Sequence, residues 1–272
     1  MRTASAGDVE IPVIGFGTWQ LKGDLCRERV EDALRLGYRH LDTAVLYDNE
    51  REVGEGLRSS GVRREEVWVT TKVWRDALRA DDLRRSVEGS LQRLGLEQVD
   101  LLLIHWPDRD IPLSETIPAL CQAQRDGLTR SIGVSNFNVA LLEQAIDLAD
   151  EPIVTNQVEY HPFLDQQTLL RACRRNGVSL TAYSPLAHGK VAENPTITAM
   201  AAEKGVTPGQ LTLRWLIQQD GVIAIPKTAS RERAGENLNV FSFQLTDDEM
   251  QAIGLLARPD GRFIESDWVD WD

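Results

Sequence analysis

A repeating alternation of short apolar runs with amphipathic segments is the feature that most limits the fold of this 272-residue chain. The amphipathic segments carry apolar residues every three or four positions, as between Leu83 and Leu94, and this spacing predicts helices. The apolar runs predict eight strands: Tyr38–Leu41, Val67–Thr71, Val99–Ile104, Arg130–Val134, Ile153–Gln157, Ser179–Tyr183, Val222–Ile225 and Val240–Phe243. Eight strands alternating with helices predict one (β/α)8 barrel domain, of the TIM type, over residues 1–272.

The two ends of the chain fall outside this repeat. We expect Val9–Trp19 to form a short β-hairpin over the barrel floor, before the first barrel strand. After Phe243 the pattern predicts one more helix, Asp247–Leu256, and then a short irregular tail rich in Asp and Trp. Two positions are open for the tail from Phe263 to Asp272: across the barrel mouth, or free in solvent as chain ends often are.

Charge and composition exclude several classes of partner. The chain has 42 acidic against 30 basic residues, a net charge of −12, and an acidic surface repels nucleic acid. No run of eighteen apolar residues predicts a membrane span, and no apolar segment near the N-terminus predicts a secretory signal. The three scattered cysteines predict neither a disulfide framework nor a zinc site, so we expect a cytoplasmic protein without a bound metal.

Ionisable side chains follow three neighbouring predicted strands. The first strand runs into Asp42 and then Tyr47, the second into Lys72, and the third into His105, where Pro107 ends it. A barrel brings these strand ends to one face. A tyrosine phenol has a pKa of about 10, and a nearby ammonium is expected to lower that pKa. The four side chains therefore predict an acid/base site in which an aspartate holds the lysine and a histidine binds the reacting oxygen.

Each of these residues also has a purely structural explanation. His105 fits a core histidine bonded to the backbone, Tyr47 an exposed residue before a helix, and Asp42 a turn cap. Lys72 is harder to explain in this way, because a buried lysine is rarely left without a partner. All four at three strand ends favour chemistry over coincidence.

The sequence resembles the aldo-keto reductase family over nearly its whole length. The matching motifs are Gly15-Phe16-Gly17-Thr18-Trp19, Gly37-Tyr38-Arg39-His40-Leu41-Asp42-Thr43-Ala44, Tyr47-Asp48-Asn49-Glu50, Thr71-Lys72-Val73-Trp74, His105-Trp106-Pro107, Gly133-Val134-Ser135-Asn136-Phe137, Asn156-Gln157, Tyr183-Ser184-Pro185-Leu186 and Ile225-Pro226-Lys227. The short chain and brief loops are most similar to the branch of bacterial 2,5-diketo-D-gluconate reductases and methylglyoxal reductases.

The resemblance implies NADPH-dependent reduction of small aldehydes and ketones, of the dicarbonyl or keto-sugar type. Tyr47 would donate the proton, Lys72 would lower its pKa, Asp42 would pair with Lys72, and His105 would orient the carbonyl. One alternative is a catalytically weak NADPH-binding subunit with a regulatory or structural role, which the intact set of four disfavours. A second is a barrel hydrolase using Asp42 with another carboxylate or a metal, but neighbouring strand ends carry no paired carboxylates.

The cofactor site follows from the resemblance alone, since the chain has no Rossmann fingerprint. Gly54-Glu55-Gly56 lies in a predicted helix and lacks the third glycine. The resemblance makes Thr18 a cofactor-binding residue and places the nicotinamide against Ser135, Asn136, Gln157 and a stacked Tyr183. It places the pyrophosphate beside Ser184 and Leu186, and the adenosine 2′-phosphate and adenine among Lys227, Thr228, Arg233 and Asn237. Thr228 replaces a common serine, and Ala187-His188 stand where glycine is frequent. Without the resemblance, the segment around Arg233 fits a solvated helix face with ordinary ion pairs.

Tryptophans border the proposed catalytic face. Trp19, Trp74 and Trp106 predict an apolar substrate wall beside His105, although core packing explains each of them as well. We expect a diffusible carbonyl compound as substrate, with no nucleic-acid or membrane partner. No interface patch is evident, and proteins of this kind work as monomers or dimers, so we expect a monomer or a weak dimer.

Overall fold

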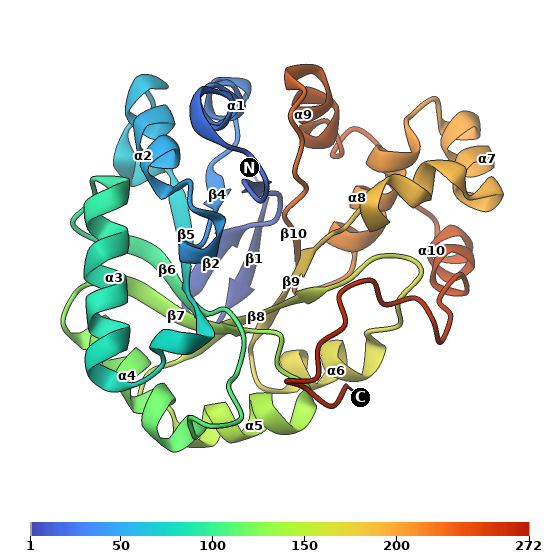
Figure 1. Cartoon of the computed structure of the whole chain (residues 1–272). Coiled ribbons are helices and arrows are strands. Elements are labelled where there is room, and N and C mark those ends of the chain that lie inside the picture. The colour runs from blue at the N-terminus through green and yellow to red at the C-terminus, as the bar shows by residue number, and fades with distance from the viewer. Residues whose placement is uncertain (1, 272) are drawn as a thin grey trace.

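The computed structural model describes residues 2–271 and shows a single barrel ringed by helices (Figure 1). Its sheet has the order β10-β9-β8-β7-β6-β5-β4-β3, and all seven pairs of neighbours in this order are parallel. The strands are β3 (Phe16–Gly17), β4 (His40–Asp42), β5 (Trp68–Val73), β6 (Val99–Ile104), β7 (Thr129–Ser135), β8 (Ile153–Glu159), β9 (Ser179–Tyr183) and β10 (Val222–Ala224). The predicted (β/α)8 fold is confirmed.

The barrel closes between its first and last strands. The amide of Gly15 donates to the carbonyl of Ala224 at 2.9 Å, and the amide of Gly17 donates to the carbonyl of Pro226 at 3.0 Å. A Cβ atom on Gly17 would lie 2.9 Å from the carbonyl oxygen of Ile225, so a side chain there would push the seam apart. Glycine at this position therefore allows the two strands to approach.

Two of the predicted elements differ from the structure. The hairpin consists of β1 (Thr3–Ala6) and β2 (Val9–Pro12), and the residues beyond it form β3 instead of continuing the hairpin to Trp19. The predicted strand Val240–Phe243 is wrong, because this segment is irregular and β3 occupies the eighth place in the barrel. Val240 is nevertheless buried, which explains its apolar character.

The hairpin lies at the barrel floor, as expected. The carbonyl oxygen of Pro12 is 3.3 Å from Nδ1 of His40, the first residue of β4, so the hairpin sits at the N-terminal ends of the strands. The opposite end of the barrel, where the strands end, is therefore left open for the site.

The helices cover the outside of the barrel (Figure 1). They are α1 (Gly23–Leu36), α2 (Glu50–Ser59), α3 (Ala80–Leu94), α4 (Leu113–Arg125), α5 (Val139–Leu148), α6 (Gln167–Arg175), α7 (Pro195–Lys204), α8 (Pro208–Gln218), α9 (Arg231–Leu238) and α10 (Asp247–Gly254), with short 3-10 helices η1 (Val45–Tyr47), η2 (Arg64–Glu66), η3 (Arg75–Ala77) and η4 (Ala187–Glu193). α10 confirms the predicted C-terminal helix. Between residues 2 and 271, none of the helices has the length and apolar character that a membrane span requires.

The glycines of Gly54-Glu55-Gly56 serve helix packing. Both lie inside α2, where a Cβ atom on Gly54 would lie 2.0 Å from the carbonyl oxygen of Leu94. A Cβ atom on Gly56 would lie 2.6 Å from the carbonyl oxygen of Arg27. Their lack of side chains lets α2 press against α3 on one side and α1 on the other, which confirms the helical interpretation of this segment.

Candidate active site

The four predicted acid/base residues meet at the C-terminal ends of β4, β5 and β6. Nζ of Lys72 lies 2.5 Å from Oδ1 of Asp42, 2.8 Å from the carbonyl oxygen of Thr43 and 3.3 Å from Oη of Tyr47. Lys72 is completely buried and Asp42 is 1% exposed. The ammonium, shielded from water, thus bridges a buried carboxylate and a half-buried phenol. The ring of His105 packs edge-on against Tyr47 with centroids 5.6 Å apart.

Asp42 is held from two further sides. Nε2 of Gln157, across the barrel on β8, donates to Oδ2 of Asp42 at 2.7 Å. The hydroxyl of Thr18 donates to the backbone carbonyl of Asp42 at 3.0 Å. Two residues expected to contact the cofactor therefore also fix the carboxylate that holds Lys72.

The structure contradicts the expected direction of the pKa shift of Tyr47. Burial of the phenol, together with the negative charge of Asp42, raises the pKa of Tyr47 well above its ordinary value of about 10. Lys72 does not reverse this, because Asp42 lies against the same ammonium and burial lowers the pKa of Lys72 itself. Tyr47 therefore keeps its proton at neutral pH.

His105 is neutral in this environment. Burial, and then the positive charge of Lys72, hold the pKa of His105 well below its ordinary value. Nδ1 of His105 is buried and has no hydrogen-bond partner among residues 2–271. A neutral imidazole carries one N–H, so it can donate a hydrogen bond to an oxygen without placing a second cation beside Lys72.

The predicted tryptophans border this centre to different degrees. The ring of Trp19 lies 4.8 Å from that of Tyr47 and is 46% exposed, and the ring of Trp74 lies 5.2 Å from that of His105. Trp106 is buried and packs on Trp268 at 5.4 Å. Trp268 also packs on Trp74 at 5.9 Å, so the C-terminal tail crosses the mouth and supplies a fourth aromatic wall.

The residues expected to hold the nicotinamide form one hydrogen-bonded group beside His105. Oη of Tyr183 donates to Oδ1 of Asn136 at 2.8 Å, and Nδ2 of Asn136 donates to the carbonyl of His105 at 2.9 Å. The hydroxyl of Ser135 donates to the carbonyl of Gln157 at 2.7 Å. These contacts join the ends of β7, β8 and β9 to the catalytic centre, so the structure brings this set together.

The stretch expected beside the pyrophosphate follows β9 into η4. Leu186 precedes η4, and the backbone is left-handed at Ser184, Ala187 and His188, with φ of 47°, 49° and 55°. For residues other than glycine this conformation costs roughly 1–2 kcal/mol each. The chain therefore reaches an unusual backbone path here without the glycine that is frequent in the family.

The residues expected at the adenosine end lie along the β10–α9 connection and α9 itself: Lys227, Thr228, Arg233 and Asn237. Lys227 and Arg233 are exposed, and within the described part of the chain neither forms an ion pair. Arg231 differs, because its Nε lies 3.3 Å from Oδ1 of Asp32. Two unpaired cations beside the N-terminus of α9, which Ser230 caps, suit an anionic phosphate.

Two residues of the site region, Trp268 and Glu159, are not predicted from the sequence. Trp268 belongs to the tail, for which the sequence leaves two positions open. Glu159, the last residue of β8, is completely buried with a carboxylate that accepts hydrogen bonds from the tail. A carboxylate two residues beyond the predicted strand Ile153–Gln157 is the available signal. Within residues 2–271 no group of three His, Cys, Asp or Glu side chains is placed to hold a metal ion.

Taken together, the barrel, the buried Lys72–Asp42 pair, the phenol and the unpaired cations near α9 fit an oxidoreductase of the carbonyl-reducing class. Residues 13–257 match the model of the Aldo/keto reductase family. The chain belongs to this family, which confirms the resemblance found in the sequence.

Similar proteins are found among both sequences and solved structures. Methylglyoxal reductase DkgB of Escherichia coli O157:H7 is 39% identical, over 96% of this chain and 99% of the relative. A crystal structure named as a candidate 2,5-diketo-D-gluconic acid reductase B is 46% identical with a TM-score of 0.98, covering 100% of this chain and 98% of that one. A Bombyx mori aldo-keto reductase in complex with NADP is 34% identical with a TM-score of 0.91, covering 100% and 98%.

Proposed function

We propose that this protein reduces small aldehydes and ketones, of the dicarbonyl or keto-sugar type, to alcohols with NADPH, and that Tyr47 donates the proton. The observation that carries the proposal is the buried ammonium of Lys72, bound by Asp42 at 2.5 Å and reaching the phenol at 3.3 Å. The names of the methylglyoxal reductase and the diketogluconic acid reductase support this class of substrate.

The residues present suit NADPH. The unpaired Lys227 and Arg233 would hold the 2′-phosphate, and the linked Ser135, Asn136 and Tyr183 would hold and face the nicotinamide. The NADP held by the Bombyx mori relative supports the same cofactor. When bound, NADPH supplies the hydride that adds to the carbonyl carbon.

The chain's own residues deal with the charge that hydride addition creates. The N–H of His105 donates to the carbonyl oxygen and stabilises the negative charge that develops there. The hydroxyl of Tyr47 then gives its proton to that oxygen, and Lys72 stabilises the resulting phenolate across 3.3 Å. Asp42 and Gln157 keep Lys72 in place. Acid catalysis of this kind is worth roughly 10²–10⁴ in rate.

The raised pKa of Tyr47 is compatible with this role. A proton donor has to be protonated before the reaction, and burial keeps the phenol neutral. An alkoxide is about as basic as hydroxide, whose conjugate acid, water, has a pKa of about 15.7. Transfer from the phenol to the developing alkoxide is therefore favourable even though Tyr47 is a weaker acid than free tyrosine.

The cysteines and the make-up of the site bear on the compartment and on the oligomeric state. All three cysteines are free and buried, which suits a reducing compartment, so we propose a cytoplasmic enzyme that acts on diffusible carbonyl compounds. We further propose that it works as a monomer or a weak dimer, since the whole acid/base set comes from one chain.

The test is loss of the NADPH absorbance band with methylglyoxal, 2,5-diketogluconate and aromatic aldehydes. Tyr47→Phe should lower kcat by at least about 100-fold and leave the Kd for NADPH within about twofold. Tyr160→Phe is the matched control, because it removes a hydroxyl that bonds Gln219 away from the site. Full turnover by Tyr47→Phe would refute the assignment. NADPH binding without turnover of any substrate would favour the regulatory or structural subunit instead.

A further inference from the structure

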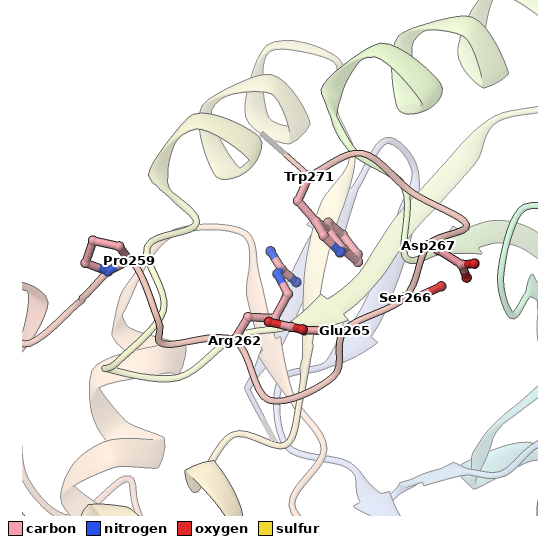
Figure 2. Close-up of a pocket in the computed structure, with 6 residues that line it drawn as sticks. All are labelled: Pro259, Arg262, Glu265, Ser266, Asp267 and Trp271. Atoms are coloured by element: carbon pink, nitrogen blue, oxygen red, sulfur yellow. The ribbon is translucent and has the colours of Figure 1, made fainter.

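The C-terminal strap, Arg262–Trp271, leaves the region of α10 and passes near β8 and α6 (Figure 1). Figure 2 shows Arg262 and Trp271 pointing toward each other from opposite arms of the strap, and the guanidinium lies 3.7 Å from the ring centroid. Between the arms is a hollow of about 600 Å³, lined by Pro259, Arg262, Glu265, Ser266, Asp267 and Trp271. None of the four catalytic side chains lines it. The strap has little core of its own, so contacts with the barrel decide its position.

Glu159 provides the deepest of these contacts. Its Oε1 accepts the backbone N–H of Phe263 at 2.9 Å, and its Oε2 accepts the backbone N–H of Ile264 at 3.0 Å. Each carboxylate oxygen thus holds one of two consecutive amides of the strap. Hydrogen bonds to a buried carboxylate are stronger than those between neutral groups.

His161 completes the anchor. Nε2 of His161 lies 3.0 Å from Oε1 of Glu159, and its ring stacks on Phe263 with centroids 4.9 Å apart. His161 is completely buried, and within residues 2–271 its Nδ1 has no hydrogen-bond partner. The imidazole therefore contacts both Glu159 and the strap.

A carboxylate is an expensive group to bury at this position. Within the described part of the chain no lysine or arginine lies within 4 Å of Glu159, so His161 is its one basic neighbour at ion-pair distance. Burial alone would raise the pKa of Glu159, but His161 and the two strap amides bring that pKa below its ordinary value. The charge is thus stabilised by His161 first and then by the two amides of the strap that it holds.

The anchored strap delivers Trp268 to the substrate side of the catalytic centre. The ring of Trp268 lies edge-on to Trp74 and Trp106, and the guanidinium of Arg75 lies 4.1 Å from its centroid. Trp74 in turn contacts His105. The position of the aromatic wall therefore depends on where the strap is held.

We propose that Glu159, supported by His161, is a positioning residue that fixes the strap and so sets selectivity for carbonyl compounds large enough to reach Trp268. An aromatic aldehyde extends from His105 toward this wall, whereas methylglyoxal, with three carbons, does not need it. The part of the proposal that concerns substrate selectivity rests on the proposed carbonyl reductase function. The part that concerns the binding of the strap to the barrel does not rest on that function, and it is tested separately.

The rate of cleavage by trypsin measures directly how firmly the strap is bound to the barrel. The Arg258–Pro259 bond resists trypsin, so Arg262–Phe263 is the first cleavable bond of the strap, and its N–H is the one bound by Oε1 of Glu159. In Glu159→Gln one carboxylate oxygen becomes an amide NH2, which cannot accept the hydrogen bond from one of the two backbone N–H groups. Release of the peptide 263–272 from native protein, followed by mass spectrometry, should accelerate at least about tenfold, because cleavage tracks the open population.

The matched control for this measurement is Glu265→Gln. It makes the same chemical change on the strap itself, at an exposed side chain that does not contact the barrel anchor. It should leave the cleavage rate within about twofold of the unmodified protein. Equal cleavage of Glu159→Gln and the unmodified protein would overturn the anchor.

Kinetics test the effect on selectivity. Glu159→Gln should raise KM for an aromatic aldehyde about tenfold with kcat within about twofold, and change KM for methylglyoxal little. If Glu159 acts by positioning Trp268, adding Glu159→Gln to Trp268→Ala should have no further effect on KM for the aromatic aldehyde. Additive effects would refute the positioning role. Lack of all carbonyl turnover in the unmodified protein would refute the proposed function and leave the cleavage result standing.

A variant on the strap tests the anchor without any change to the barrel, so that misfolding of the barrel cannot explain the result. Ile264→Pro removes the N–H that Oε2 of Glu159 accepts and leaves the barrel sequence unchanged. It should raise KM for the aromatic aldehyde in the same direction as Glu159→Gln. An unchanged KM would count against the anchor even if Glu159→Gln failed to fold.

Discussion

The buried Lys72–Asp42 pair makes a quantitative prediction about stability. Asp42→Asn keeps the size of the side chain but removes the charge that lies 2.5 Å from Nζ of Lys72. Both groups are essentially inaccessible to water, so the ammonium would be left with neutral partners only: the amide oxygen of the new side chain, the carbonyl of Thr43 and the phenol. Breaking one side of a buried pair costs about 3–5 kcal/mol, and we expect this loss in the free energy of unfolding at pH 7.

The pair should couple strongly in a double-mutant cycle. Lys72→Met alone strands the carboxylate of Asp42, although Gln157 still donates to its Oδ2 at 2.7 Å. Asp42→Asn with Lys72→Met removes both charges, and neutral replacement of a buried pair is often nearly neutral. The double variant should therefore lose at least about 2 kcal/mol less than the sum of the single losses.

The pH dependence gives an independent check on the sign. In Asp42→Asn the pKa of Lys72 falls further below its unfolded value of about 10.4, because burial lowers it and Asp42 no longer opposes that shift. Between the two pKa values the unfolded chain binds the extra proton. The stability of the variant should therefore rise with pH across that window, relative to the unmodified protein.

Urea unfolding followed by tryptophan fluorescence at pH 7 and pH 9 measures all of these quantities. The reasoning would fail if Asp42→Asn cost less than about 1 kcal/mol, or if the two single losses simply added. A variant whose stability fell from pH 7 to pH 9 relative to the unmodified protein would show that Lys72 does not carry a stranded charge.

Three further predictions follow from the site and the packing. The kcat/KM for carbonyl reduction should stay flat from about pH 6 to pH 9, because Tyr47 remains protonated below its raised pKa and His105 is neutral; a limb near pH 7 would contradict both directions. Arg233→Ala should raise the Kd for NADPH about 10- to 100-fold and hardly affect NADH, whereas Arg231→Ala, which removes an arginine already paired with Asp32, should alter neither by more than about threefold in fluorescence titrations. Gly54→Ala should lower the free energy of unfolding by more than about 3 kcal/mol, since its Cβ atom would meet the carbonyl of Leu94 at 2.0 Å; a normal urea midpoint would show that α2 and α3 can move apart.

Local pattern was enough for most of the barrel and for grouping the candidate acid/base residues. The sequence predicts the strand Val99–Ile104 with the bounds it has in β6, because the apolar run 101–104, with Pro107 shortly after it, is a signal contained in adjacent residues. Strand ends meet at one face in any such barrel, so Asp42, Lys72 and His105 could be grouped without coordinates. Local pattern does not predict the side chains that close the site.

What the sequence determined, then, is the repeat of strands and helices and the chemical identity of the residues at the strand ends, because both are properties of short stretches of chain. Only the tertiary structure decided that Phe16–Gly17 is the first barrel strand, since a two-residue strand has no periodicity and is defined by its pairing with β4 and by the bond from Gly17 to Pro226 that closes the barrel. It also reversed the expected pKa shift of Tyr47, because desolvation depends on everything packed around the phenol. The hold of Glu159 on the C-terminal strap, from more than a hundred residues away, likewise exists only once the chain is folded.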